Sequence, residues 1–231
     1  MQNGEANVGD ARSKILLGID TCGSTGTVAL GHWDGAEFLV LGQTELEARS
    51  FSATLVKAVG HLLATHGVLR PDGILVVNGP GSFTGVRVGL GAAKGFAEAW
   101  QVPVATVSRL EVMTAQSGEA NAALDAHRHE VYLRLGGAGQ APREFLAGTT
   151  ELKATGAAPG RVAVCDEAAA VLLPEAWPAV ECVRIAAPTA RDALAHFSSR
   201  LMREKILDLA LLDGHYLRRS DAEIFGEAKE A

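Results

Sequence analysis

The strongest constraint on the fold is a glycine-rich turn that directly follows a short apolar run. The run Gly73–Val77 leads into Asn78–Gly89, which reads NGPGSFTGVRVG. Glycine and proline together force a sharp reversal of the chain, and the hydroxyl groups of Ser82 and Thr84 can cap the first free amides of a helix. The segment therefore predicts a strand, a tight turn and a helix that runs to Trp100.

The turn matches neither of the two common phosphate-binding loops. No Lys-Ser or Lys-Thr pair follows its last glycine, and its glycine spacing differs from the dinucleotide fingerprint by one residue. An anion could bind the amides at the helix N-terminus, but a tight structural turn explains the same residues, with the phenylalanine as a packing anchor. The motif loop comprises Gly79, Pro80, Gly81, Ser82, Phe83, Thr84 and Gly85.

Strands and helices alternate along the chain, which predicts an α/β fold. Helical spacing of apolar residues from Phe51 to His66 predicts the first long helix, and a capping-box pattern at Thr189 predicts the last. We expect a mobile extension over 1–13 and two lobes, 14–107 and 108–231. Apolar runs predict strands at Lys14–Asp20, Thr25–Gly31, Phe38–Gln43, Gly73–Val77, Val102–Val107, Ala122–Asp125, Val131–Leu135 and Arg161–Cys165.

Composition excludes several classes of protein. The chain has 231 residues, 48% of them hydrophobic, yet no apolar run approaches the roughly 18 residues of a membrane helix. The net charge is −6 and no Lys/Arg cluster stands out, so a self-sufficient nucleic-acid binder is not expected. The first dozen residues lack the apolar core of a secretory signal. Three scattered cysteines suit a reducing cytoplasm.

Three segments together resemble one family, the bacterial TsaB (YeaZ) proteins. They are Ile15–Thr21, reading ILLGIDT, the Gly-Pro-Gly loop, and Asp125–Tyr132, reading DAHRHEVY. Members of that family are accessory subunits of the tRNA threonylcarbamoyladenosine machinery and relatives of the glycoprotease family. The likeness runs from about residue 14 to about residue 223 and includes the tail Tyr216–Glu223. One departure is Arg49–Ser52, where family members usually carry a histidine.

The resemblance implies the two-lobed actin-like ATPase fold of acetate and sugar kinases, heat-shock ATPases and actin, with mixed sheets flanked by helices. Such proteins hold ATP phosphates between two hairpin loops, one per lobe. The first loop here would begin at Asp20 and Thr21, which keep the pattern. In the second, His127, Arg128 and His129 replace small residues and obstruct the approach of phosphate. We therefore expect a degenerate nucleotide site and no cofactor bound by the chain itself.

The sequence contains little evidence for a metal site or a catalytic nucleophile. His61 and His66 are five residues apart and do not share a helix face. His127 and His129 have no further metal ligands nearby in the sequence. Cys22 and Ser82 occupy a loop and a helix start but lie in no known nucleophile motif. We expect no metal site and no catalytic residue.

Two helices, Ala48–His66 and Gly85–Trp100, carry few charges, so each has more apolar surface than one sheet can cover. Burial of the two helices in the core of this chain explains their low charge as well as contact with another chain does. On the second interpretation the partner interface consists of Leu55, Val59, Gly85, Val88, Gly89, Ala92 and Phe96.

The resemblance implies a non-catalytic scaffold that binds and activates the TsaD threonylcarbamoyltransferase. A TsaE-like ATPase would complete the complex, tRNA would bind only through it, and the chain alone would form a homodimer. ATP or ADP and metal would belong to the partner subunits, and the location would be cytoplasmic with no membrane contact. Two alternatives remain open: an autonomous small-molecule kinase or ATPase of the actin-like superfamily, and a glycoprotease-like hydrolase.

Overall fold

The computed structural model describes residues 13–47, 50–137, 139–155, 158–203 and 208–218. The predicted N-terminal extension therefore lies outside the described residues, except for Ser13. Ala48 and Arg49, predicted to open the first helix, and the tail from residue 219 onward lie outside them as well.

The described chain forms two five-stranded sheets. The first has the order β3-β2-β1-β4-β5 and the second the order β10-β9-β6-β7-β8. Strands of the first sheet are β1 (Lys14–Asp20), β2 (Gly26–Trp33), β3 (Phe38–Leu46), β4 (Gly73–Val77) and β5 (Val104–Val107). Strands of the second are β6 (Ala122–Asp125), β7 (Glu130–Gly137), β8 (Gln140–Gly148), β9 (Arg161–Val164) and β10 (Glu181–Arg184).

The two sheets repeat one topology. In each, the first three strands form an antiparallel meander, and the fourth strand pairs in parallel with the first, as β4 does with β1 and β9 with β6. The fifth strand is again parallel to the fourth. Two mixed sheets flanked by helices confirm the predicted α/β, actin-like fold class.

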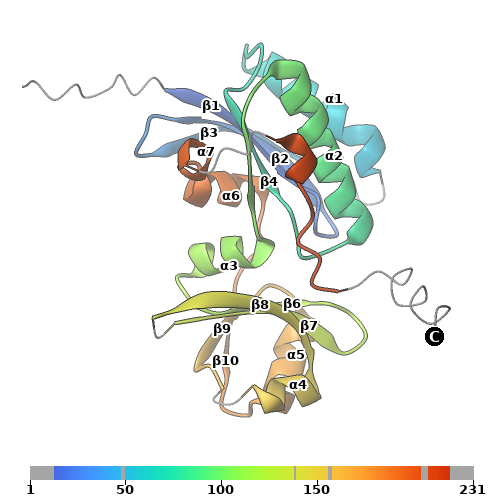
Figure 1. The fold of residues 1–231 in the computed structure, drawn as a ribbon, viewed down its shortest axis with the longest axis vertical. Helices are drawn as coiled ribbons and strands as arrows, with labels where there is room; N and C mark the ends of the chain where they lie inside the picture. The colour runs from blue at the N-terminus through green and yellow to red at the C-terminus, as the bar shows by residue number, and fades with distance from the viewer. Residues whose placement is uncertain (1–12, 48–49, 138, 156–157, 204–207, 219–231) are drawn as a thin grey trace, which may run out of the picture.

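Helices cover both faces of each sheet, so the molecule is built in layers (Figure 1). One outer layer is α1 (Phe51–Thr65) and α2 (Phe83–Trp100), which pack on the first sheet. The other is α4 (Thr149–Ala154) and α5 (Glu167–Ala176), with α5 packed on the second sheet. Between the sheets lie α3 (Arg109–Ser117) and α6 (Ala190–Phe197), which contact each other. Strand β4 is buried at every position because it is covered on both sides, as its continuous apolar run predicts.

The chain returns to the first lobe after the second sheet is complete. Helix α6, which the sequence analysis groups with the second lobe, packs on β1, β2 and β3 of the first. Its predicted capping box is present: Thr189 Oγ1 accepts from the Asp192 amide, and the Asp192 carboxylate accepts from the Thr189 amide. The Ala190 amide donates to Thr27 Oγ1 at 2.8 Å and so anchors the helix to β2. Helix α7 (Arg200–Arg203) and the 3₁₀ turn η1 (Leu209–Leu211) follow.

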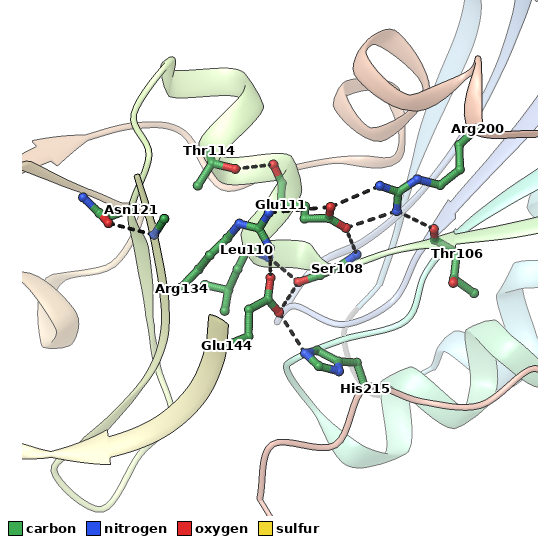
Figure 2. A network of polar contacts seen from close by, with 11 residues as sticks. Thr106, Ser108, Leu110, Glu111, Thr114, Asn121, Arg134, Glu144, Arg200 and His215 are labelled. Carbon is green, nitrogen blue, oxygen red and sulfur yellow. Dashed lines mark hydrogen bonds and ion pairs between the residues drawn. The ribbon is translucent and has the colours of Figure 1, made fainter. Parts of the chain in front are cut away.

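A buried carboxylate, Glu144 on β8, ties the second lobe to the chain crossing from the first. Its oxygens accept hydrogen bonds from Arg134 Nη1 at 2.6 Å and from Ser108 Oγ at 2.6 Å, and His215 Nε2 lies 2.8 Å away (Figure 2). Ser108 caps α3, and His215 belongs to the C-terminal tail. Three segments distant in sequence therefore meet at one side chain.

A second carboxylate, Glu111 on α3, extends this network toward the first lobe (Figure 2). Arg200 Nη2 lies 3.1 Å from Glu111 Oε1, and Arg134 Nη2 lies 3.7 Å from the same oxygen. Arg200 Nη1 also donates to the Thr106 carbonyl at the end of β5. Because these charges are shielded from solvent on most sides, the network holds the lobes together more firmly than an exposed ion pair would.

Candidate functional site

The cleft between the lobes is the main candidate site, with a volume of about 960 Å³. The turn after β1, the Gly-Pro-Gly loop and the β6–β7 turn all contribute to its walls, so the two predicted phosphate loops do face one space. Its lining comprises Cys22, Gly23, Ser24, Phe51, Ser52, Gly81, Ser82, Phe83, Thr84, Gly85, Val88, Arg109, Asp125, Ala126, His127, Tyr132 and Arg218.

The Gly-Pro-Gly loop forms the predicted strand-to-helix turn. The Gly79–Pro80 peptide bond is cis, and Gly79 has φ +114°, a conformation that favours glycine. Helix α2 begins at Phe83, and Ser82 caps it by accepting from the Gly85 amide at 3.3 Å. The hydroxyl therefore has the capping role that the sequence predicts.

The glycines of this loop allow α2 to lie directly against the turn after β1. A Cβ atom at Gly81 would overlap the carbonyl group of Cys22, and one at Gly85 would overlap the carbonyl oxygen of Thr21. The Ser82 amide donates to the Cys22 carbonyl at 2.9 Å, and Thr21 Oγ1 donates to the Gly85 carbonyl at 2.6 Å. Close backbone packing therefore explains these residues without a ligand.

Asp20, the acidic residue of the first loop, is held inside the protein. It is 2% exposed, and its Oδ1 accepts a hydrogen bond from the Cys22 amide at 2.8 Å. Its Oδ2 lies 3.9 Å from Nε of Arg109, the first residue of α3. Burial raises the pKa of Asp20, and the nearby Arg109 cation opposes that rise. Nothing in the local sequence around Arg109 predicts that it lies beside Asp20.

The second loop combines a glycine-like backbone with bulky side chains. His127, Arg128 and His129 have φ values of 60°, 59° and 59°, in the left-handed region where residues with a Cβ are uncommon. His127 Nδ1 lies 2.9 Å from Asp125 Oδ2, and the His127 amide donates to Asp125 Oδ1. The loop therefore keeps the backbone path suited to glycine but surrounds it with three large side chains.

The C-terminal tail closes part of the cleft. Arg218 donates to the Glu130 carboxylate and, at 3.4 Å, to the His127 carbonyl. Two residues earlier, Tyr216 packs against Phe83, with ring centroids 5.2 Å apart, and the Arg87 guanidinium lies 3.8 Å over the Phe83 ring. Phe83 thus has the packing contact predicted for it. The tail is one of the segments that carry the family resemblance, but no local pattern predicts that Arg218 lies in the cleft.

The candidate nucleophile Cys22 is buried and protonated. Burial raises the pKa of its thiol well above the usual value, and the neighbouring Asp20 raises it further. Its Sγ donates to the Val77 carbonyl at 3.2 Å. Among the described residues, no group of three or more His, Cys, Asp or Glu side chains is arranged to hold a metal ion. The described helices also include none long and apolar enough to cross a membrane.

The predicted interface residues mostly face inward. Leu55 and Val59 are each 1% exposed, and a Cβ at Gly89 would overlap the hydroxyl of Thr21. Gly85 is buried as described above. The remaining three, Val88, Ala92 and Phe96, are partly buried against the first core. Low charge at Leu55, Val59, Gly85 and Gly89 therefore reflects packing within the chain, whereas Val88, Ala92 and Phe96 keep some exposed surface.

Comparisons with known proteins agree with the motifs. A family model described as TsaD, tRNA N6-adenosine threonylcarbamoyltransferase, matches residues 43–146. Proteins named tRNA threonylcarbamoyladenosine biosynthesis protein TsaB from Haemophilus influenzae and Escherichia coli are 34% and 36% identical over 125 residues. These matches cover 51% of this chain and 51% and 52% of the relatives, so the chain spans about half the length of the curated relatives it matches.

The structural matches cover a larger part of this chain than the sequence matches do. A Pseudomonas aeruginosa structure titled as an uncharacterized protein with similarity to peptidase YEAZ has a TM-score of 0.67 and 25% identity. That match covers 88% of this chain and 99% of the other. A second structure, YeaZ from Pseudomonas aeruginosa, gives a TM-score of 0.66 at 24% identity with the same coverage, which shows the shared fold. The chain is therefore similar to proteins named TsaB and YeaZ, as its motifs predict.

Proposed function

We propose that the chain is a non-catalytic accessory subunit in the synthesis of tRNA threonylcarbamoyladenosine, where it binds and activates a TsaD-like transferase. Its curated relatives are named as biosynthesis proteins of this tRNA modification. The observation that carries the non-catalytic role is the second loop of the cleft, in which His127, Arg128 and His129 occupy left-handed positions suited to glycine. Large side chains there keep phosphate away from the backbone amides.

The first loop supports the same proposal. In kinases of the superfamily the counterpart of Asp20 orients a metal-bound water. Here one Asp20 oxygen accepts from the Cys22 amide, and the other faces the Arg109 cation at 3.9 Å. A positive charge at this distance competes with a divalent cation for the same carboxylate. An autonomous kinase or ATPase is therefore the weaker alternative, and the hydrolase alternative lacks a thiolate because Cys22 is protonated.

In this proposal the chemistry belongs to the partners. A TsaD-like subunit and a TsaE-like ATPase would carry the metal and the ATP or ADP, tRNA would bind through the assembled complex, and the complex would work in the cytoplasm. The chain alone would form a homodimer through the surface that otherwise receives the transferase, which makes the two associations mutually exclusive.

The outer faces of α1 and α2 are the surface best suited to this contact. The two helices contact each other and form one outer layer of the first lobe (Figure 1). Val56 on α1 is 58% exposed, and added Cβ atoms at Gly60, Gly91 and Gly95 would meet no neighbour within 4 Å. Small residues on adjacent helices allow another backbone to approach closely. These four exposed positions are added to the partly exposed residues Val88, Ala92 and Phe96 of the interface that the sequence suggests.

Gly91→Glu tests this surface. We expect the variant to fold, because the position is open, and to lose both homodimer and transferase binding, because a charge would be buried against the partner. The penalty of about 2 kcal/mol or more raises the dissociation constant at least tenfold. Light scattering and pull-down with the TsaD-like protein of the same organism measure the two associations.

Gly160→Glu is the matched control, because Gly160 is also an exposed glycine with open space around it but precedes β9 in the second lobe. It should leave both associations unchanged. Normal association of Gly91→Glu, with circular dichroism showing a folded protein, would place the interface elsewhere. Copurification of the native protein with other chains, followed by mass spectrometry, tests the partner assignment independently.

A second test concerns the cleft. Purified chain should hydrolyse ATP far more slowly than the roughly one turnover per second of an ordinary enzyme. The reason is the pairing of Asp20 with Arg109 opposite an obstructed second loop. A coupled phosphate-release assay measures it, with Asp20→Asn as the control for contaminating ATPases. Turnover near one per second that disappears in Asp20→Asn would favour the kinase or ATPase alternative.

A further inference from the structure

The side chain of Arg109 is largely buried, yet it has no hydrogen-bond acceptor among the described residues. It is 12% exposed, and its closest carboxylate oxygen, Asp20 Oδ2, lies 3.9 Å away, beyond hydrogen-bond distance. Its Nε is buried without a partner in the described part of the chain. A guanidinium offers five N–H donors in a planar fork, and leaving a buried donor unpaired is costly. The side chain is therefore poised for an acceptor that the chain itself does not provide.

A second arginine in the same cleft, Arg218, shares this feature only at its Nε. Of the three buried side-chain nitrogen and oxygen atoms without a partner in the described residues, two are Nε of Arg109 and Nε of Arg218. Both arginines line the 960 Å³ cleft. They come from different segments, the start of α3 and the C-terminal tail. Arg218 already donates through Nη2 to Glu130 and His127, so Arg109 is the cleft arginine for whose side chain the described residues supply no hydrogen bond.

The charge of the lining fits an anion. The charged residues that line the cleft are Arg109, Arg218 and Asp125. Asp125 is paired with His127 at 2.9 Å, and Arg218 is paired with the Glu130 carboxylate, so Arg109 is left to meet an anion. The Asp20 carboxylate lies beneath the lining and is 2% exposed. Ser24 and Ser82 add hydroxyl groups to the same walls. Arg109 is thus the charged side chain of the lining that makes no hydrogen bond within the described residues, and its nearest carboxylate oxygen lies 3.9 Å away.

We infer that the interlobe cleft binds a small molecule through an oxyanion, a carboxylate or phosphoryl group, that Arg109 holds directly and without a metal ion. The planar guanidinium suits either group because both offer two oxygens at matching spacing. This binding site does not depend on the proposed scaffold function, since it requires no partner chain.

The inference is tested by titrating the full chain with sodium phosphate and with sodium acetate, each against sodium chloride at equal ionic strength. The Nε–Hε proton resonance of Arg109, identified by its loss in Arg109→Lys, should shift with at least one of the two anions. Arg109→Gln should weaken that binding at least tenfold, because the bidentate contact is removed. Response to phosphate alone identifies a phosphoryl ligand, response to acetate alone identifies a carboxylate, and response to both identifies a site that accepts either oxyanion.

Two further variants make the test specific. Arg143→Gln removes the same charge from an exposed residue outside the cleft lining, and binding should be unchanged. Gly23→Ala keeps every charge but places a Cβ 2.6 Å from Arg109 Nη2, so it should displace the guanidinium and weaken binding even if Arg109→Gln fails to fold. Equal effects of phosphate, acetate and chloride on the wild type, or undiminished binding in the cleft variants, would overturn the inference.

Discussion

Gly85→Ala should lower the free energy of unfolding by about 3 kcal/mol or more. The added methyl group would overlap the carbonyl oxygen of Thr21, which is backbone and cannot rotate away as a side chain would. Moving α2 outward to relieve the overlap would also lengthen the 2.6 Å hydrogen bond from Thr21 Oγ1 to the Gly85 carbonyl. Urea denaturation followed by circular dichroism measures the change.

Gly91→Ala is the matched control on the same helix. A Cβ at Gly91 meets no neighbour within 4 Å, so the substitution should stabilise the protein by up to about 1 kcal/mol through helix propensity alone. The two alanine variants should therefore differ in sign. Equal unfolding midpoints for Gly85→Ala and the wild type would show that α2 does not lie against the turn after β1.

Glu144→Gln should cost about 3 to 5 kcal/mol of stability, because it breaks a buried ion pair and leaves Arg134 without its closest charge partner. The side chains of Glu144 and Arg134 are only 7% and 16% exposed, so water cannot replace the lost contact easily. His215 and Ser108 lose their charged acceptor in the same substitution. Chemical denaturation at neutral pH measures the loss.

The same carboxylate makes stability depend on pH. Burial alone would raise the pKa of Glu144, but hydrogen bonds from His215, Ser108 and Arg134 outweigh it and hold that pKa below its usual value. A depressed folded-state pKa contributes stability above the unfolded-state value of about 4.3, and this is lost as pH falls through the folded-state pKa.

Wild type should therefore lose more stability than Glu144→Gln between about pH 5 and pH 3. Glu175→Gln, at an exposed glutamate on α5, is the control and should follow the wild-type pH dependence. Parallel stability curves for wild type and Glu144→Gln over this range would contradict the assigned network.

Local sequence was sufficient for the strand, turn and helix that form one wall of the candidate site. The apolar run of β4 and the glycine, proline and hydroxyl residues after it predict strand, turn and helix correctly, because turn geometry and helix capping depend on neighbouring residues. The alternation of strands and helices predicted the α/β class for the same reason. The mixed segments from about residue 136 lacked such signals, and β8, α4, α5 and β10 were not assigned there. Helix α3, which carries Arg109, was not assigned either.

Tertiary structure alone decided which way residues face. Gly89 and Gly91 are both helical glycines, but the first packs on Thr21 and the second faces open space, a difference that depends on where the turn after β1 lies. Arg109 and Arg218 are 109 residues apart in the sequence, yet both line one cleft. The return of α6 to the first sheet likewise depends on contacts between distant segments. Sequence periodicity determines which residues share a face of an element, whereas long-range packing determines what that face meets.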